Sequence, residues 1–179
     1  NSEATKADLD AWLACNKQAA PTRVVPLAHQ FGLQQRGIPE SVADETVGTA
    51  VRAATASPFV VHVGTREPRK NLLALAKAWQ LIQETLGPDT PRLIIAGSRG
   101  WLHEEFDAFI AETKSLGGRI VIIERPSDRD LAYLYRRCMF TVFVSVKEGW
   151  GLPIGEGLWF GRPVVCSNTS SMPEVGRHL

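Results

Sequence analysis

The sequence predicts an α/β protein in which helices cover both faces of a parallel β-sheet. Three observations predict this class. Short apolar runs of strand length recur along the chain, each is followed by a segment with an apolar helical face, and the runs are apolar almost throughout instead of alternating. Strands buried on both faces by crossover helices have this composition. The 179 residues, 44% of them hydrophobic, suffice for one sizeable core.

Strands and helices are expected in regular alternation. The predicted strands are residues 59–63, 92–96, 119–123, 140–144 and 164–166. The first three helices have apolar faces formed by Leu72, Leu75, Ala76, Trp79 and Leu86, by Phe106, Phe109, Ile110 and Leu116, and by Leu131, Leu134 and Tyr135. A fourth helix begins near Pro153. Open parallel sheets bind ligands at the carboxyl ends of their strands, so the loops after the strands form the candidate binding edge.

The first part of the chain has a different pattern. Ser2 can cap a helix whose apolar positions share a face, namely Leu9, Trp12 and Leu13. Pro21 ends this helix before a short extended run at residues 23–27. From residue 28 onward no sustained period appears, which favours a linker or loop.

Two regions are therefore expected. Residues 1–57 are predicted to be a remnant of an N-terminal domain with its crossing strand and linker, and residues 58–179 a truncated C-terminal domain. Because the chain opens at Asn1 and stops shortly after a strand-and-turn pattern, we expect it to be a fragment.

Charge and hydropathy exclude several partners. The chain has 20 Lys and Arg against 19 Asp and Glu, so no net field attracts nucleic acid or an anionic membrane. The longest apolar runs are too short to span a bilayer, and no signal peptide is visible. We therefore expect a cytoplasmic protein that binds no nucleic acid.

Cysteine and histidine usage predicts no disulfide framework and no metal site. Three cysteines form no close pair and are expected to be reduced packing residues, namely Cys15, Cys138 and Cys166. The four histidines have no metal-ligand spacing, and His62 lies within a predicted strand. No cofactor or metal is expected.

The segment 148–156 carries the strongest functional signal. Gly149 and Gly151 allow backbone N–H groups to turn toward a ligand, and Pro153 suits the first helical position. A helix N-terminus at the binding edge favours an anion such as a diphosphate. Glu148 and Glu156 could accept hydrogen bonds from sugar hydroxyls. The spacing of these two glutamates proves nothing alone, because residues 104 and 112 are glutamates too and lie along an ordinary amphipathic helix.

A basic loop follows the first predicted strand. Lys70 directly precedes a helix that Asn71 is expected to cap, so its ammonium could meet a diphosphate. Arg66 or Arg69 could assist, and the sequence leaves the choice open. The alternative is a basic loop that is merely solvated.

Three other features are interpreted as structural. Asp128 and Asp130 have the spacing of a metal-binding carboxylate pair, but Ser127 and Asp130 fit a capping box at a helix start. The glycine pair at 97 and 100 is more typical of a turn than of a phosphate cradle. Aromatic residues on helical faces are expected in the core, whereas Trp150 is expected to be exposed between its glycines.

These segments resemble glycosyltransferase family 4. Residues 148–156 resemble its two-glutamate donor motif, residues 161–165 and 167–175 its next strand and loop, and residues 64–71 its basic phosphate-binding loop. The resemblance implies one half of a GT-B fold, in which two Rossmann-like domains face each other across a cleft and the C-terminal one holds the donor. Thr65 stands where that family usually has an Arg after the loop glycine.

By this resemblance, the catalytic residues are Glu148, which contacts the transferred sugar, and Lys70. Glu156 contacts the ribose, and the loop that begins at Ile123 lies beside the base. The implied donor-binding set is Arg66, Arg69, Gly149, Trp150, Gly151, Leu152, Glu156 and Ile123.

The resemblance implies a retaining glycosyltransferase that passes a sugar from a nucleotide diphosphate to an acceptor hydroxyl, in the style of bacterial polysaccharide mannosyltransferases using GDP-mannose. The acceptor is expected to be a saccharide or a lipid-linked one. Peripheral association with the inner face of the plasma membrane, through the missing half, stays open. The alternatives are another GT-B enzyme such as a nucleotide-sugar epimerase, and a non-catalytic nucleotide-binding module. Alone, the fragment is expected to be poorly active.

Overall fold

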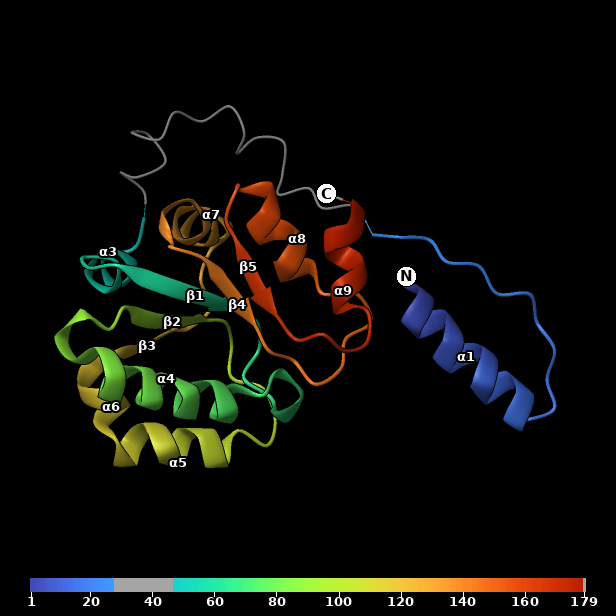
Figure 1. Ribbon diagram of the computed structural model, residues 1–179, viewed down its shortest axis with the longest axis horizontal. Helices are drawn as coiled ribbons and strands as arrows, with labels where there is room; N and C mark the ends of the chain where they lie inside the picture. Colours follow the sequence, from blue (N-terminus) through green and yellow to red (C-terminus); the bar gives the residue numbers. More distant parts are fainter. Residues whose placement is uncertain (28–46, 179) are drawn as a thin grey trace.

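The computed structural model describes residues 1–27 and 47–178 and confirms the α/β class (Figure 1). Its five strands are parallel and lie in the order β3-β2-β1-β4-β5. The strands are β1 (Phe59–Val63), β2 (Arg92–Ala96), β3 (Ile120–Ile123), β4 (Thr141–Phe143) and β5 (Val164–Cys166). Each overlaps a predicted run, with ends that differ by at most one residue.

Helices cover both faces of this sheet. On one face lie α4 (Leu72–Leu86), α5 (Glu104–Glu112) and α6 (Lys114–Gly118) (Figure 1). On the other lie α3 (Thr49–Ala54), α7 (Asp128–Arg137) and α8 (Leu152–Trp159), and α9 (Met172–Val175) follows β5. Single-turn 3₁₀ helices are η2 (Pro68–Lys70), η3 (Gly87–Asp89) and η4 (Gly176–His178). Among the described residues, no helix is long and apolar enough to cross a membrane.

Apolar side chains form core layers on both faces of the sheet. Successive side chains of a strand point to opposite faces. Phe59 and Val61 therefore pack against α3 and α7, whereas Val60 packs against α4 and α5. This two-sided burial explains the near-continuous apolar runs in the sequence.

Several predicted helix details are wrong. Leu86 is 48% exposed, because it ends α4 beside Gly87 instead of facing the sheet. The second predicted helix ends at Glu112, because residues 114–117 adopt positive φ. Leu116, within this turn, is nevertheless buried as expected. Cys138 is buried as expected, but Cys15 is exposed.

The region before β1 also differs from its prediction. Residues 49–54 form α3, and Val47, Val51 and Ala54 are buried in the core where the sequence suggested a loop. The rest of the predicted linker, residues 28–46, lies outside the described residues. The boundary between the two expected domains stays a prediction.

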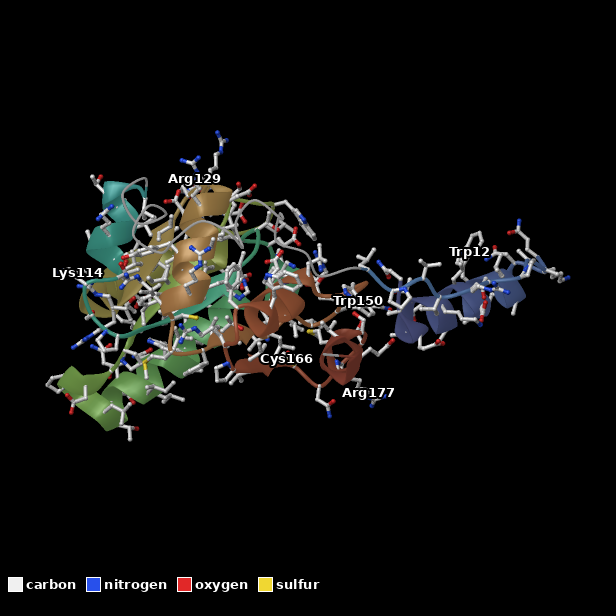
Figure 2. The ribbon with its side chains drawn as sticks, turned by 90° about the horizontal axis from the view of Figure 1, so that it is seen from above. Trp12, Lys114, Arg129, Trp150, Cys166 and Arg177 are labelled. Atoms are coloured by element: carbon white, nitrogen blue, oxygen red, sulfur yellow. The ribbon has the colours of Figure 1, made fainter. Side chains whose placement is uncertain are left out.

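The N-terminal helix α1 (Glu3–Cys15) lies beside the sheet domain at its first residues and extends away from it toward its C-terminal end (Figure 1). Ser2 caps it as predicted, accepting a hydrogen bond from the backbone of Thr5. It buries none of its residues, and Trp12 is 55% exposed (Figure 2). The following run at residues 23–27 forms no strand.

Candidate functional site

The strand order places the candidate site between β1 and β4. From β1 the chain builds outward through β2 and β3, then returns to the other side of β1 to form β4 and β5. Ligands of open α/β sheets bind at such a reversal, outside the carboxyl ends of the strands. The loop after β1 carries Lys70 and the loop after β4 carries Glu148, so the two residues flank this point.

Lys70, Arg69 and Glu148 form an ion cluster at this edge. The Lys70 Nζ atom donates to Glu148 Oε1 at 2.7 Å, and the Arg69 guanidinium pairs with the other carboxylate oxygen. Arg69 also pairs with Glu67 and donates to the Lys147 carbonyl oxygen at 3.1 Å. The prediction that Lys70 and the 148–156 segment face each other is confirmed.

The ion cluster packs against an aromatic ring, that of Phe143. Lys70 is 8% exposed, and its ammonium lies 4.9 Å from the centre of the Phe143 ring. His62 from β1 stacks on the same ring, with centroids 5.8 Å apart. A cation over an aromatic face is stabilised by the ring quadrupole, which offsets part of the cost of burying the ammonium.

Asn71 positions this lysine in a way the sequence did not indicate. Asn71 occupies the N-cap position of α4 as predicted, but its side chain makes no capping hydrogen bond. Instead Asn71 adopts a left-handed conformation with φ of 58° and joins η2 to α4. Asparagine tolerates this conformation better than most residues. The resulting turn holds Lys70 at the carboxyl edge of the sheet.

The Glu148 carboxylate is kept ionised by its partners. Burial would raise the pKa of Glu148, but the hydrogen bond and charge of Lys70, together with Arg69, outweigh burial and lower the pKa below its usual value. The side chain is only 9% exposed. An acceptor with a fixed negative charge therefore lies beside two cations.

His62 is a buried, neutral imidazole next to the Phe143 ring. The ring is fully buried, and burial lowers the pKa of His62 to about 4. Its Nδ1 atom lies 3.0 Å from the Val142 carbonyl oxygen, while Nε2 has no hydrogen-bond partner among the described residues. At neutral pH the imidazole adds no charge to the ion cluster.

This depressed pKa predicts an acid-sensitive fold. Between pH 6.5 and 4 the unfolded chain binds a proton on His62 that the folded chain does not, so stability falls as pH falls through this window, by about 2–3 kcal/mol between pH 7 and 4.5. We expect His62→Asn, whose amide can still donate to Val142, to lose most of this decline in urea unfolding. An unchanged decline in the variant would show that other groups cause it.

The glycine-rich loop after β4 starts helix α8. Gly151 has φ of 105°, which side chains rarely adopt, and its N-cap position lacks a side-chain hydrogen bond. Leu152 occupies the first helical position and is 43% exposed, so Pro153 takes the second position instead of the predicted first. Because the loop after β4 leads directly into α8, the helix N-terminus lies at the carboxyl ends of the strands, as predicted.

Trp150 does not lie as predicted. It is 5% exposed and packs in a cluster with Phe143, Ile154, Met172 and Val175. The left-handed turn at Gly151 follows directly, and the indole of Trp150 packs beneath the loop in this apolar cluster. Figure 2 shows Trp150 on the side of the domain that faces α1.

Serine hydroxyls hold the backbone of Glu148. Ser170 and Ser171 donate to the Glu148 carbonyl oxygen at 2.6 and 2.9 Å, and the Glu148 N–H group lies 3.3 Å from the Ser170 hydroxyl. Ser171 also donates to the carbonyl of Trp150 at 2.9 Å. The sequence interpretation missed this role, although both serines fall in the segment 167–175.

Arg66 ties loops together instead of joining the ion cluster. It is 2% exposed, pairs with Glu124 next to Ile123, and donates to the Gly97 carbonyl oxygen at 3.4 Å. Of the two arginines left open by the sequence, Arg69 is the one that contacts Glu148. Ile123 is itself 7% exposed at the end of β3.

Glu156 lies on α8 and faces α7. Its carboxylate accepts a hydrogen bond of 2.6 Å from the Tyr135 hydroxyl. Burial raises the pKa of Glu156, with a smaller contribution from Asp128 and a partial offset by the tyrosine. The two predicted glutamates thus have opposite pKa shifts, because Glu148 has cationic partners and Glu156 has a neutral one.

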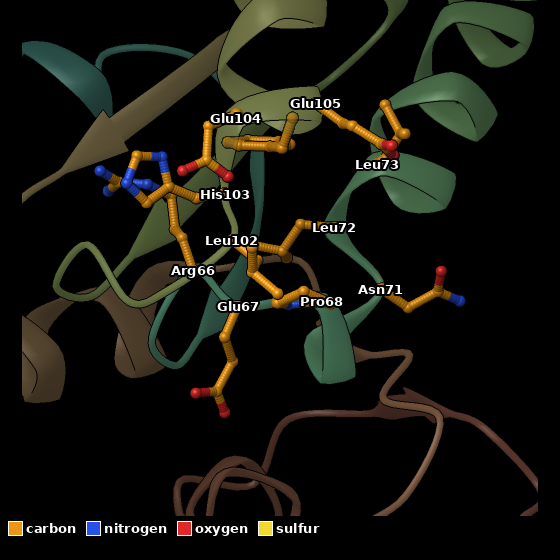
Figure 3. Close-up of a pocket in the computed structure, with 11 residues that line it drawn as sticks. Arg66, Glu67, Pro68, Asn71, Leu72, Leu73, Leu102, His103, Glu104 and Glu105 are labelled. Carbon is orange, nitrogen blue, oxygen red and sulfur yellow. The ribbon is translucent and has the colours of Figure 1, made fainter.

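A separate pocket of about 420 Å³ lies beside this edge (Figure 3). It is lined by η2 and the first turns of α4 and α5, including Arg66, Pro68, Leu72 and Glu104. Neither Lys70 nor Glu148 lines it. Lys70 and Glu148 thus lie outside this pocket, although Glu67, the partner of Arg69, is among the residues that line it.

The features interpreted as structural behave accordingly. Ser127 and Asp130 form both hydrogen bonds of a capping box at the start of α7. Gly97 and Gly100 lie in the tight contact between the loops after β1 and β2. In the described ranges, no three His, Cys, Asp or Glu residues are grouped to hold a metal ion. That the protein needs no metal or cofactor stays a prediction.

Solved structures share this architecture at low sequence identity. Sucrose-phosphate synthase from Thermosynechococcus elongatus matches with a TM-score of 0.70 at 22% identity, over 95% of this chain and 40% of that one. TarM matches with a TM-score of 0.64 at 18% identity, over 97% and 30%. These likenesses define the class of fold, a Rossmann-like domain of GT-B type.

The sequence model for group 1 glycosyl transferases matches residues 47–179, and the chain belongs to this family. It is 41% identical over 119 residues to O-antigen chain mannosyltransferase B of Escherichia coli, covering 65% of this chain and 30% of that protein. The serotype-specific mannosyltransferase WbdA of Escherichia coli is 28% identical over 174 residues, or 95% and 21%. The chain thus spans less than a third of these relatives.

Proposed function

We propose that this chain is the donor-binding part of a retaining glycosyltransferase that moves a sugar from a nucleotide diphosphate to an acceptor hydroxyl. The observation that carries this proposal is the ion cluster of Lys70, Arg69 and Glu148 at the strand-order reversal. Cations beside a helix N-terminus suit a diphosphate, and an ionised carboxylate suits sugar hydroxyls. Family membership supports the same reading.

Each member of the cluster has a role in this proposal. Lys70, Arg69 and the N-terminus of α8 stabilise the negative charge that grows on the leaving diphosphate. Glu148 binds the transferred sugar, and Glu156 binds the ribose once the Tyr135 hydroxyl yields or shares its carboxylate. The loop after Ile123 lies beside the base. None of these steps requires a metal.

The named relatives suggest the sugar. Two of them are called mannosyltransferases, and one of these acts on an O-antigen chain by its name. We therefore propose mannosyl transfer from GDP-mannose to a saccharide or lipid-linked acceptor in polysaccharide synthesis, at the cytoplasmic face of the membrane.

Calorimetric titration of the chain with GDP, UDP and dTDP tests the donor site and identifies the base. We expect GDP to bind most tightly and Lys70→Ala to weaken its binding at least tenfold, because one charge-assisted contact to the diphosphate is lost. Lys77→Ala is the matched control, since Lys77 is exposed on α4. If none of the three nucleotides binds, the proposed function is wrong.

A further inference from the structure

Helix α1 contacts the sheet domain through its N-terminal tip. The Glu174 carboxylate, on α9, accepts hydrogen bonds from the backbone N–H groups of Glu3 and Ala4 at 2.8 and 2.9 Å. One residue further on, the Thr5 hydroxyl donates to the Gly149 carbonyl oxygen at 3.0 Å. Figure 1 shows this end of α1 beside α9, with the opposite end far from the domain.

The tip contact is polar and directional. The first N–H groups of a helix lack partners within the helix and carry the positive end of its dipole, so a carboxylate there is favourable. Asp8, one turn further along, pairs with Lys147 at 2.7 Å. Since α1 buries none of its own residues, these polar contacts attach it to the domain in place of an apolar interface.

The same contacts converge on the segment that carries Glu148. Lys147 and Gly149, the neighbours of Glu148, are held from the α1 side. From the other side, Ser170 and Ser171 hold the Glu148 backbone at the start of the turn that leads into α9. The backbone around Glu148 is therefore held both by α1 and by the two serines, while Lys70 and Arg69 hold its carboxylate.

We propose that Glu174 and Thr5 are positioning residues that couple the docking of α1 to the placement of Glu148. With the tip docked, the backbone of residues 147–149 is fixed and Glu148 is presented to the sugar of the donor. With the tip released, Lys70 and the α8 N-terminus still bind the diphosphate. This inference rests on the proposed function, in which Glu148 binds the transferred sugar.

The test compares a nucleotide with its nucleotide-sugar. We expect Glu174→Ala and Thr5→Val in this chain to weaken calorimetric binding of GDP-mannose about three- to tenfold, the effect of losing a helix-end contact or one hydrogen bond, and to change GDP binding less than about twofold. Thr5→Ser, which keeps the hydroxyl, should restore wild-type binding. Glu3→Ala is the matched control, because it removes an exposed glutamate from the same tip.

Amide hydrogen exchange adds a direct readout of docking. The N–H groups of residues 3 and 4 should exchange faster in Glu174→Ala than in Glu3→Ala. If Glu174→Ala weakens GDP and GDP-mannose equally, or weakens neither, the coupling is wrong while the proposed function stands. If the wild-type chain binds neither ligand, the proposed function fails first.

Discussion

Replacing Lys70 with alanine should slow sugar transfer about 10²–10³-fold, the usual cost of one preorganised donor at a site of developing charge. The ammonium is nearly buried, lies over Phe143 and donates to Glu148. After its removal, a water molecule would not replace its fixed positive charge beside the leaving diphosphate. The measurement is kcat at saturating donor, in an enzyme that joins this chain to an acceptor-binding domain.

The same substitution should also move the pH profile. Lys70 is the strongest of the partners that lower the pKa of Glu148, so its removal raises that pKa and shifts the acidic limb of the rate profile to higher pH. Lys77→Ala should leave both the rate and the profile unchanged. Turnover by Lys70→Ala within threefold of wild type, on the order of 1 kcal/mol or less, would contradict the assigned role.

Local and periodic features of the fold could be predicted from the sequence. The five strands are recognisable because burial on both faces makes them apolar throughout. The capping box of Ser127 and Asp130 uses residues three apart. The meeting of Lys70 and Glu148 follows from topology alone, since both loops leave parallel strands at the same edge.

Features that depend on long-range contacts could not be predicted. Val51 and Ala54 form a helix in the core because strand residues such as Phe59 and Val61 cover them, and their own segment has no clear period. Trp150 is buried partly by Met172 and Val175, which lie more than 20 positions further along the chain. The glycines on either side of Trp150 give no sign of this burial.

The candidate site likewise combines features that the sequence predicts with long-range contacts that it does not. A glutamate in residues 167–175 is visible in the sequence, but the groups it binds are the N–H groups of residues 3 and 4, about 170 positions earlier. The choice between Arg66 and Arg69 also needed the fold. Arg66 pairs with Glu124 across two loops, a contact that no local sequence pattern predicts. Arg69 is therefore the arginine that pairs with Glu148.

Replacing Gly97 with alanine is expected to destabilise the fold by about 3 kcal/mol, at the upper end of overpacking effects. A Cβ atom there would lie 2.0 Å from the Gly64 carbonyl oxygen. Neither loop can easily move, because Gly64 N–H donates to Ala96 at 3.0 Å and Arg66 N–H donates to Ser98 at 2.9 Å. Steric overlap between two anchored backbones must therefore separate the carboxyl ends of β1 and β2.

Urea unfolding measures this effect, with Gly176→Ala as the control because a Cβ at that position has open space and its φ is −78°. The Gly97 variant should also bind nucleotide more weakly, since the loop that must shift leads directly into Lys70. Equal unfolding midpoints for the two variants would mean that the loops yield without cost. In that case the tight contact would not be what holds the lysine in place, and its position would have to depend on Glu148 and Phe143 alone.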